Sequence, residues 1–305
     1  MKGKQYDMYD VLIIGGGPAG ITAGIYAKRF NLKVGIFEND SPGGAVTKTD
    51  LINNYPGFDG IAGYELASKM FNQLMNLEVE YIPEKVTNIE KYDNHFIVKG
   101  ENEYESKTVI IATGTKENTL NIPTEEKYFY RGISWCAVCD GPLYKDKDVA
   151  VVGGGMSAIS SALSLSKYAN KVYLIHRRDS FRGELKDLEI LKSKENVEII
   201  TNSQIIEFKG TEKLESIVIS NNNKQAKEIQ VKCVFECVGK LPNTSQFSSI
   251  INLNENGYII TNSKLETNVK GIFACGDVVE KDVRQIATAI NDGAIAAISA
   301  NNYLK

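Results

Sequence analysis

Two cysteines with two residues between them, Cys136 and Cys139, are the residues of this sequence best suited to chemistry. A Cys-x-x-Cys pair can close a small disulfide, open it again and so carry two electrons. Asp140 follows directly, where a carboxyl group can move the proton that this chemistry requires. Gly141 and Pro142 come next and predict a turn. The sequence therefore predicts a thiol–disulfide redox centre.

Half of a zinc site is the main alternative for this cysteine pair, and zinc would need a second Cys-x-x-Cys or a Cys/His pair. The other candidate ligands are isolated in the sequence: Cys233, Cys237, Cys275, His95 and His176. The three single cysteines lie in apolar, strand-like segments, as is typical of small core residues. His95 is most simply a turn residue, and Trp135 can pack either over the disulfide or in the core. We therefore favour redox chemistry and expect no metal site.

The composition is that of an ordinary soluble protein, with 305 residues, 43% apolar and 24% charged residues and a net charge of −3. The length suits two domains, and the mild acidity argues against nucleic acid as the main partner. Residues 1–10 lack the apolar core of a signal peptide, and no apolar run approaches the length of a membrane span. An odd number of cysteines, five, argues against a secreted disulfide framework. We therefore expect a reducing, cytoplasmic compartment.

A dinucleotide-binding pattern opens the chain and offers a source of electrons. The apolar run 11–14 predicts a buried strand, which enters Gly15-Gly16-Gly17-Pro18-Ala19-Gly20 and so fits G-x-G-x-x-G. A helical pattern over 21–30 and a strand over 33–37 follow, ending at Glu38. The glycines let the backbone approach a pyrophosphate, whose charge the helix N-terminus favours, and Glu38 can accept hydrogen bonds from a ribose.

The same unit returns after a shift of 138 residues without a gap. Gly15 and Gly17 align with Gly153 and Gly155, and Lys33-Val34 aligns with Lys171-Val172. Such internal repetition predicts two dinucleotide sites in one chain.

The two units differ in charge at their tips, by which we mean the residues that follow the second strand of each unit. Glu38 aligns with His176, which opens His176-Arg177-Arg178, and Arg182 lies a turn later. A carboxylate suits a free ribose diol, whereas a basic tip suits a ribose 2′-phosphate. A solvated helix start is the alternative for the arginines. The sequence therefore predicts FAD at the first unit and NADPH at the second.

Each unit is followed by a similar tail, over 86–113 and 205–239, that predicts a small antiparallel meander returning to the main sheet. Residues 115–122 and 241–248 read as links, and a strand pair near 253 and 258–260 and an Ala-rich helix over 294–300 close the chain. We predict an α/β fold with two Rossmann-like domains of ββα-type three-layer architecture, one inserted into the other. The predicted FAD-binding domain covers 1–116 and 245–305, and the predicted NADPH-binding domain, with the redox disulfide, covers 117–244.

Taken together, these motifs resemble the low-molecular-weight, bacterial-type thioredoxin reductases, class II of the pyridine nucleotide-disulfide oxidoreductases, over nearly the whole chain. The Cys-x-x-Cys-Asp just ahead of the second Gly-rich turn discriminates, because glutathione-reductase-like enzymes carry their cysteines near the first nucleotide unit. Besides the motifs above, the resemblance is carried by Pro42-Gly43-Gly44, Asn54-Tyr55-Pro56-Gly57, Gly239 with Pro242-Asn243-Thr244, Gly276-Asp277 and Arg284-Gln285.

The resemblance implies an NADPH-dependent homodimer that reduces thioredoxin through FAD and a Cys136–Cys139 disulfide. It implies that Cys139 faces the flavin, that Asp140 is the acid–base group and that Cys136 attacks the partner disulfide. The residues expected around FAD are Gly15, Gly17, Pro18, Ala19, Gly20, Glu38, Gly44, Asn54, Val86, Thr113, Gly114, Gly276, Asp277, Arg284 and Gln285. The residues expected around NADPH are Gly155, Ser157, His176, Arg177, Arg178 and Arg182.

The layout poses a physical problem, because NADPH and the disulfide belong to one domain and both need the flavin. We therefore expect the inserted domain to rotate on the two links between half-reactions. The alternatives within the enzyme class are a flavin disulfide reductase that serves another small redox protein or a peroxiredoxin, and a dithiol oxidase, which would not need the arginine tip. A ferredoxin–NADP reductase would lack the Cys-x-x-Cys. A non-catalytic flavin redox sensor is the alternative from another class.

Overall fold

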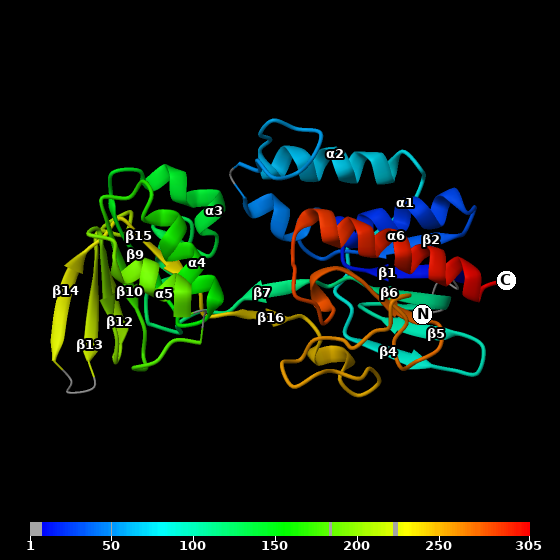
Figure 1. The fold of residues 1–305 in the computed structure, drawn as a ribbon. Helices are drawn as coiled ribbons and strands as arrows, with labels where there is room; N and C mark the ends of the chain where they lie inside the picture. The colour runs from blue at the N-terminus through cyan, green and yellow to red at the C-terminus, as the bar shows by residue number, and fades with distance from the viewer. Residues whose placement is uncertain (1–7, 50, 183–184, 222–224) are drawn as a thin grey trace. The chain divides into compact units, whose positions relative to one another are not determined.

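The chain is described here by a computed structural model that covers residues 8–49, 51–182, 185–221 and 225–305. It divides into two compact units, which we call unit 1 (Met1–Lys116 and Leu241–Lys305) and unit 2 (Glu117–Lys240) (Figure 1). The chain leaves unit 1 through β7 (Thr115–Glu117) and returns through β16 (Lys240–Pro242), and these two strands pair with each other. The return link is shorter than the predicted 241–248, because Phe247 is fully buried in the core of unit 1.

Unit 1 is built on a sheet in the order β3-β2-β1-β6-β5-β4, with β17 also paired to β6. Strands β1, β2, β3, β6 and β17 run parallel, whereas β4, β5 and β6 form the predicted antiparallel meander. The apolar run at 11–14 is buried in β1, as predicted. The strands are β1 (Tyr9–Ile14), β2 (Val34–Phe37), β3 (Glu80–Ile82), β4 (Asn88–Lys91), β5 (Phe96–Lys99), β6 (Glu103–Ile111) and β17 (Ile272–Ala274). The predicted strand pair near 253 and 258–260 is reduced to one bridge between Leu253 and Ile259.

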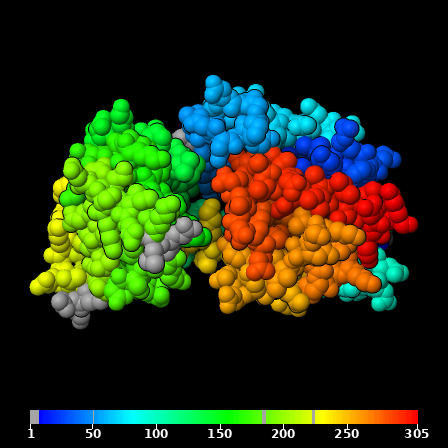
Figure 2. Space-filling view, in the orientation of Figure 1, coloured from blue at the N-terminus to red at the C-terminus, as the bar shows by residue number. Residues whose placement is uncertain are grey.

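The helices of unit 1 are α1 (Pro18–Arg29), α2 (Gly63–Met75) and α6 (Ile286–Tyr303). Helices α1 and α6 lie against each other, and α6 also forms part of the surface of unit 1, where it is drawn in red (Figures 1 and 2). Their approach depends on Gly293, because a Cβ there would collide with the carbonyl oxygen of Ala19. The Ala-rich pattern at 294–300 therefore predicted a packed helix correctly, and α6 holds the first Gly-rich turn in place.

Unit 2 contains a parallel sheet in the order β11-β10-β9-β15-β8 and a separate antiparallel meander, β12-β13-β14. The sheet strands are β8 (Ile133–Ser134), β9 (Asp148–Val152), β10 (Lys171–Ile175), β11 (Val197–Ile200) and β15 (Cys233–Glu236). The meander strands are β12 (Ser203–Lys209), β13 (Ser216–Asn221) and β14 (Ala226–Gln230), and the predicted turn at 221–223 lies partly outside the described residues. The helices are α3 (Ala137–Asp140), α4 (Met156–Leu165) and α5 (Leu185–Lys192).

The internal repeat holds at the level of strand register. Val11 pairs with Val34 in unit 1, and Val149 pairs with Val172 in unit 2, so the pairing is conserved under the shift of 138 residues. In both units the strand ends at a glycine of positive φ, 111° at Gly15 and 146° at Gly153. The predicted α/β class with two Rossmann-like units is therefore confirmed.

Glu84, just ahead of β4, fixes the β5–β6 turn of unit 1. Its carboxylate accepts hydrogen bonds from the backbone N–H groups of Glu101 and Asn102 (2.8 and 3.0 Å), from Asn102 Nδ2 (2.7 Å) and from Tyr104 Oη (2.7 Å). Burial alone would raise the pKa of Glu84, but these hydrogen bonds together lower it. Folding thus favours the ionised form, so the contribution of Glu84 to stability is complete well above pH 4.5 and is lost as the pH falls through the lower pKa of the folded state.

Replacement of Glu84 by Ala is expected to lower the free energy of unfolding by about 3 kcal/mol, because the buried Tyr104 hydroxyl and three part-buried amide donors lose their acceptor. Urea unfolding at pH 7 measures this loss, and the difference from the wild type should shrink below pH 4. Glu105→Ala, at an exposed position on β6, serves as the matched control and should cause no comparable loss. Equal stability of Glu84→Ala and the wild type at pH 7 would contradict the assignment.

Among the described residues, no helix combines the length and the apolarity that crossing a membrane would require.

Candidate functional site

Cys136 and Cys139 form a disulfide with their Cα atoms 5.3 Å apart, at the start of α3 in unit 2. Cys136 is the N-cap of this single helical turn, and the N–H of Cys139 donates to Cys136 Sγ at 3.2 Å. Both cysteines are half-buried. The structure therefore forms the disulfide that the redox prediction requires.

Asp140 is held beside the disulfide by Ser134, a residue that the sequence reasoning missed. Ser134 Oγ donates to Asp140 Oδ2 at 2.6 Å and accepts a hydrogen bond from the N–H of Cys136 at 3.1 Å. Ser134 is buried, and it ends β8, which pairs with β15. A hydroxyl two residues ahead of the first cysteine was the available signal, since serine often bonds the backbone at that spacing.

Apolar side chains flank the disulfide at the surface of unit 2. Val138, between the cysteines, is 73% exposed, and Leu143 is 65% exposed. Trp135 packs edge-on against Phe129 and Tyr130, with ring centroids 4.8 and 5.8 Å away, so it belongs to the core side of the turn. Exposed apolar groups beside a reactive centre are typical of a surface that contacts another macromolecule.

The first Gly-rich turn leaves the N-terminus of α1 open to a ligand. Gly17 is the N-cap and offers no side chain, and a Cβ there would meet no atom of the described residues within 4 Å. Gly43 folds against this turn, because its N–H donates to the Gly16 carbonyl at 2.8 Å, and Gly44 lies beside Gly17. Pro18 occupies the first turn of the helix. Open backbone N–H groups at a helix N-terminus fit a pyrophosphate.

Glu38 lies at the tip of the first unit, as predicted. Its Oε2 accepts the N–H of Gly16 at 2.9 Å and its Oε1 accepts the N–H of Asp40 at 2.8 Å. A carboxylate has about four acceptor positions, so each oxygen keeps capacity for a ribose hydroxyl. The residues of this turn therefore fit an adenosine diphosphate group such as that of FAD.

A second group of predicted residues is linked by hydrogen bonds around the start of α6. Asn54 Nδ2 donates to Gln285 Oε1 at 3.0 Å, and Arg284 Nε donates to the Asp277 carbonyl at 3.2 Å. The Arg284 guanidinium also lies 4.0 Å from the centroid of the Tyr258 ring. These contacts bring together three segments that lie far apart in the sequence.

Gly276 connects that group to the first turn, because it has positive φ and a Cβ on it would lie 2.7 Å from the Cβ of Ala19. Its N–H donates to Asp292 Oδ2 at 3.2 Å, and Lys281 Nζ bonds the same oxygen at 2.7 Å. Sequence reasoning did not assign Asp292 and Lys281 to this site, because their contacts depend on how α6 packs.

Thr113 lies beside the first Gly-rich turn, because a Cβ on Gly15 would come within 3.1 Å of the Thr113 backbone nitrogen. Thr113 and Gly114 bond to the returning chain, with Thr113 Oγ1 donating to the Asn243 carbonyl at 2.7 Å and the N–H of Asn243 donating to the Gly114 carbonyl at 3.1 Å. Val86 is a buried residue of the apolar core of unit 1. Their role as FAD contacts stays a prediction.

The second Gly-rich turn repeats the first. Gly155 is the N-cap of α4, and a Cβ on it would meet no atom of the described residues within 4 Å. Met156 and Ser157 are exposed in the first turn of α4. This open helix N-terminus also fits a pyrophosphate.

His176 is turned inward rather than toward a ligand. It is 7% exposed, its Nε2 lies 3.1 Å from the Ser180 carbonyl oxygen, and its ring fills the space beside Gly154. Burial lowers the pKa of His176, and the neighbouring arginines lower it further. The ring is thus neutral at pH 7, and it supports the turn in this structure; binding of NADPH by His176 stays a prediction.

The three arginines of the second tip are exposed: Arg177, Arg178 and Arg182. The N–H of Arg182 donates to the Gly154 carbonyl at 2.7 Å, which ties this arginine to the Gly-rich turn. No ion pair recorded among the described residues engages the three guanidinium groups. A site with this charge fits a ribose 2′-phosphate.

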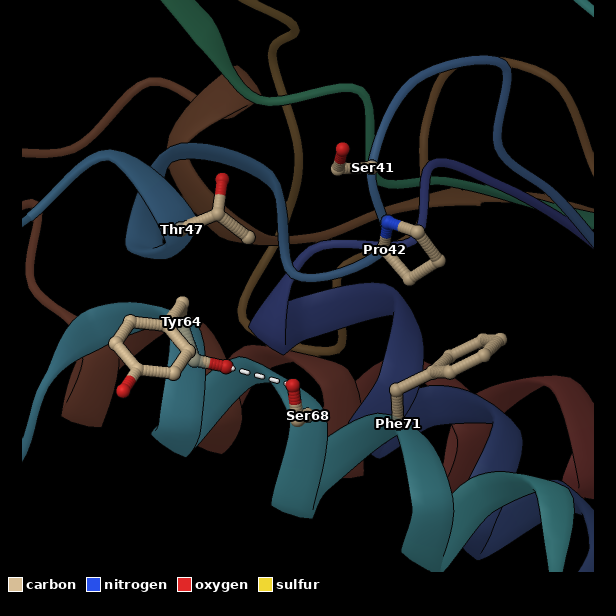
Figure 3. A pocket seen from close by; sticks show the side chains of 6 residues that line it. All are labelled: Ser41, Pro42, Thr47, Tyr64, Ser68 and Phe71. Carbon is tan, nitrogen blue, oxygen red and sulfur yellow. Dashed lines mark hydrogen bonds between the residues drawn. The ribbon is translucent and has the colours of Figure 1, made fainter.

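Two other features do not belong to these sites. An open pocket of about 360 Å³ lies between residues 41–47 and α2, and none of the residues predicted to bind a cofactor or to act in catalysis lines it (Figure 3).

The thiols of Cys233 and Cys275 are buried, as predicted for core residues, and burial raises the pKa of each. Cys237 is half-buried and lies 3.4 Å from Ser161 Oγ.

Comparison with known proteins gives similarities over nearly the whole chain. A family model described as pyridine nucleotide-disulphide oxidoreductase matches residues 9–293. Thioredoxin reductase of Mycoplasma pneumoniae is 42% identical over 305 residues, which cover 99% of this chain and 97% of that protein. Thioredoxin reductase of Bacillus subtilis is 39% identical over 309 residues, with 99% and 96% coverage. The crystal structure of thioredoxin reductase from Streptococcus pyogenes has a TM-score of 0.85 at 44% identity, covering 97% of this chain and 98% of that one.

Proposed function

Since this chain belongs to the pyridine nucleotide-disulphide oxidoreductase family, we propose that it is an NADPH-dependent thioredoxin reductase that works through FAD and the Cys136–Cys139 disulfide. The observation that carries the proposal is this disulfide with Asp140 held beside it, in the unit that also bears the basic nucleotide turn. The homodimer and the cytoplasmic location are parts of the proposal that rest on resemblance and on cysteine usage.

The two Gly-rich turns are assigned to different cofactors in this proposal. The first turn with Glu38 would hold FAD, and Asn54, Arg284 and Gln285 would complete that site. The second turn with Arg177, Arg178 and Arg182 would hold NADPH. The bound flavin would supply the chemistry that accepts a hydride and passes on two electrons.

The disulfide then does the chemistry that belongs to this chain. Two electrons and two protons convert Cys136 and Cys139 into thiols, and Asp140 would exchange a proton with Cys139. The Cys136 thiolate attacks the thioredoxin disulfide, which forms a mixed disulfide and releases one thioredoxin sulfur as a thiolate. Cys139 attacks Cys136 Sγ, which closes the chain's own disulfide and releases reduced thioredoxin.

The chain offers this partner an apolar surface, since Val138, between the two cysteines, and Leu143, four residues after Cys139, are both exposed. A small protein with its own exposed disulfide would pack there. A flavin disulfide reductase for another small redox protein or a peroxiredoxin would use the same surface. A non-catalytic sensor would need neither the Cys136–Cys139 disulfide nor the arginines of the second unit.

Rotation of unit 2 between half-reactions is also part of the proposal. A glycine of positive φ precedes each connecting strand, Gly114 (62°) before β7 and Gly239 (101°) before β16. Glu117 Oε1 and Lys240 Nζ lie 2.9 Å apart across these strands. A short covalent cross-link between side chains introduced at positions 117 and 240 should stop turnover and spare one half-reaction, whereas unchanged turnover would exclude rotation on these strands.

Steady-state turnover tests the function. NADPH oxidation should depend on added oxidised thioredoxin and should yield one thioredoxin dithiol for each NADPH. Turnover with a peroxiredoxin or another disulfide protein but not with thioredoxin would select the alternative reductase. A flavin that NADPH does not reduce would select the sensor.

Replacement of Ser134 by Ala is expected to lower kcat by about tenfold, because one charge-assisted hydrogen bond contributes about 1.5 kcal/mol to the placement of Asp140. The pH dependence of kcat should also change, since the hydroxyl donates to the ionised carboxylate. Ser166→Ala is the matched control, a buried serine of unit 2 whose hydroxyl bonds only the local Leu163 carbonyl among the described residues. An unchanged rate and pH profile for Ser134→Ala would refute its role.

A further inference from the structure

Glu236 is an acid in the interior of unit 2 that the proposed mechanism does not use. It ends β15, a strand flanked by β8 and β9, and it is 2% exposed. Neither of its carboxyl oxygens has a hydrogen-bond donor among the described residues. A buried polar group without a partner is costly, and a buried charge is more so. The position of Glu236 therefore calls for a neutral, protonated side chain.

Strand register places Glu236 beside Trp135. In the parallel pair of β15 and β8, Val234 is opposite Ile133 and Phe235 is opposite Ser134. Glu236 and Trp135 are the next residues of the two chains, so they lie side by side and face the same side of the sheet. Trp135 Nε1 is likewise buried without an acceptor among the described residues.

A second buried acid, Glu125, acts on Glu236 through its charge. It is 3% exposed, and its two oxygens accept the N–H groups of Leu120 (2.8 Å) and Ile122 (2.9 Å). Accepting at both oxygens is the pattern of an ionised carboxylate. Burial, and then the charge of Glu125, raise the pKa of Glu236 to about 9. Glu236 is therefore protonated at neutral pH.

The other titratable groups near Glu236 are thiols. Cys233 and Cys237 both sense its charge, and burial raises the pKa of each. Asp140 acts on Cys233 and Glu117 acts on Cys237, so the charges around this cluster are negative. No lysine, arginine or histidine of the described residues acts on Glu236. A shared proton can hold the two acids together.

We propose that Glu236 and Glu125 share one buried proton next to Trp135, and that this acid pair positions Trp135 and, through it, Cys136. Loss of the proton would leave two carboxylates facing each other in the core. Their repulsion would displace the Trp135 ring from Phe129 and Tyr130 and shift the segment that carries Cys136. Glu236 is thus a positioning residue. The shared proton follows from the structure alone, whereas its effect on catalysis rests on the proposed function.

The only tryptophan of the chain is Trp135, so one indole N–H signal reports on this site. The experiment records that signal by ¹⁵N NMR of the FAD-loaded protein between pH 7 and 10.5. In the wild type it should move with a single midpoint near pH 9, matching the pKa of about 9 for Glu236. In Glu236→Gln, a neutral isostere, the signal should stay constant over that range. Glu126→Gln, an exposed neighbour of Glu125, should behave like the wild type.

Tyr130, which contacts Trp135, does not confuse this result, because burial raises its pKa from 10. Absence of any transition below pH 10 in the wild type, or an identical transition in Glu236→Gln, would overturn the proposal. Glu125→Gln provides a second test, since removal of its charge should move the midpoint to lower pH. A midpoint that stays in place or rises in Glu125→Gln would exclude the shared proton.

The rate of thioredoxin reduction tests whether Glu236 affects catalysis. Thioredoxin reduction by Glu236→Gln should match the wild type within about twofold at pH 7.5, where the acid is protonated. At pH 10 the wild type should be about tenfold slower than Glu236→Gln, because one pH unit above the pKa leaves about a tenth of the protein protonated. Equal rates at pH 10 would refute positioning. Absence of thioredoxin reduction at every pH, with the indole transition intact, would refute the proposed function and leave the shared proton standing.

Discussion

Replacement of Cys136 by Ser is expected to lower thioredoxin reduction at least about 10³-fold, because removal of a covalent nucleophile has effects of this size or larger. NADPH should still bleach the flavin of this variant, since Cys136 is not needed for that half-reaction. The serine hydroxyl cannot form the mixed disulfide, so electrons stop at the flavin. Stopped-flow absorbance of the flavin and steady-state turnover measure the two halves separately.

Cys237→Ser is the matched control for this result. Cys237 lies in the same unit, is half-buried and takes no part in the disulfide. Its replacement should leave turnover within about twofold, since the change is nearly isosteric. Full activity of Cys136→Ser would contradict the assignment of the redox centre, and equal loss in both variants would indicate damage to the fold.

Replacement of both Arg177 and Arg178 by Ala is expected to weaken discrimination between NADPH and NADH by about 10²- to 10³-fold. Each charge-assisted hydrogen bond to a phosphate contributes about 1.5–3 kcal/mol, and the double variant removes two such donors. The KM for NADPH should rise, whereas kcat/KM for NADH should stay nearly constant, because NADH has no 2′-phosphate. Steady-state kinetics with both nucleotides give the ratio.

A charge-matched double variant, Lys167→Ala with Lys232→Ala, controls for the loss of two positive charges. Both lysines are exposed in unit 2 and lie outside the Gly-rich turn. Their replacement should leave the NADPH-to-NADH ratio unchanged. An unchanged NADPH-to-NADH ratio in the arginine variant would show that Arg177 and Arg178 do not bind the ribose 2′-phosphate. It would favour a different electron donor.

The repeated nucleotide unit could be predicted because its signal is local. Gly15 and Gly153 each end a buried strand where a tight turn needs positive φ, and the strand, turn and helix follow one another within a few tens of residues. The shift of 138 residues predicted two such units, and the strand register of the two units matches under the same shift. The disulfide could be predicted for the same reason, since only two residues lie between its cysteines.

What the sequence did not reveal depends on contacts between distant segments. Asn54 bonds Gln285, and Glu125 lies near Glu236, across separations that no local pattern encodes. The role of Ser134 could in principle have been predicted, because Ser134 lies only two residues before Cys136. A single serine is too common in proteins, however, to identify a site. His176 was predicted from its alignment with Glu38, and only packing against Gly154 reveals that its ring turns inward.

The links show the limit of composition as a guide to domain boundaries. A proline and polar neighbours at 241–248 are typical of a connecting segment, yet Phe247 inserts fully into the core of unit 1. Burial of one aromatic side chain stabilises the packed arrangement by about 2 kcal/mol, enough to anchor a short segment. The connection between the two units is thus confined to the paired strands β7 and β16.

An anaerobic titration of the flavin tests most directly the central claim, that two electrons pass from NADPH through FAD and Cys136–Cys139 to thioredoxin. The purified protein is titrated with NADPH, or separately with NADH, and oxidised thioredoxin is then added. The account predicts bleaching by NADPH at far lower concentration than by NADH, and full recovery of the oxidised flavin spectrum once thioredoxin is present. Bleaching by NADH alone, or a reduced flavin that thioredoxin does not reoxidise, would contradict it.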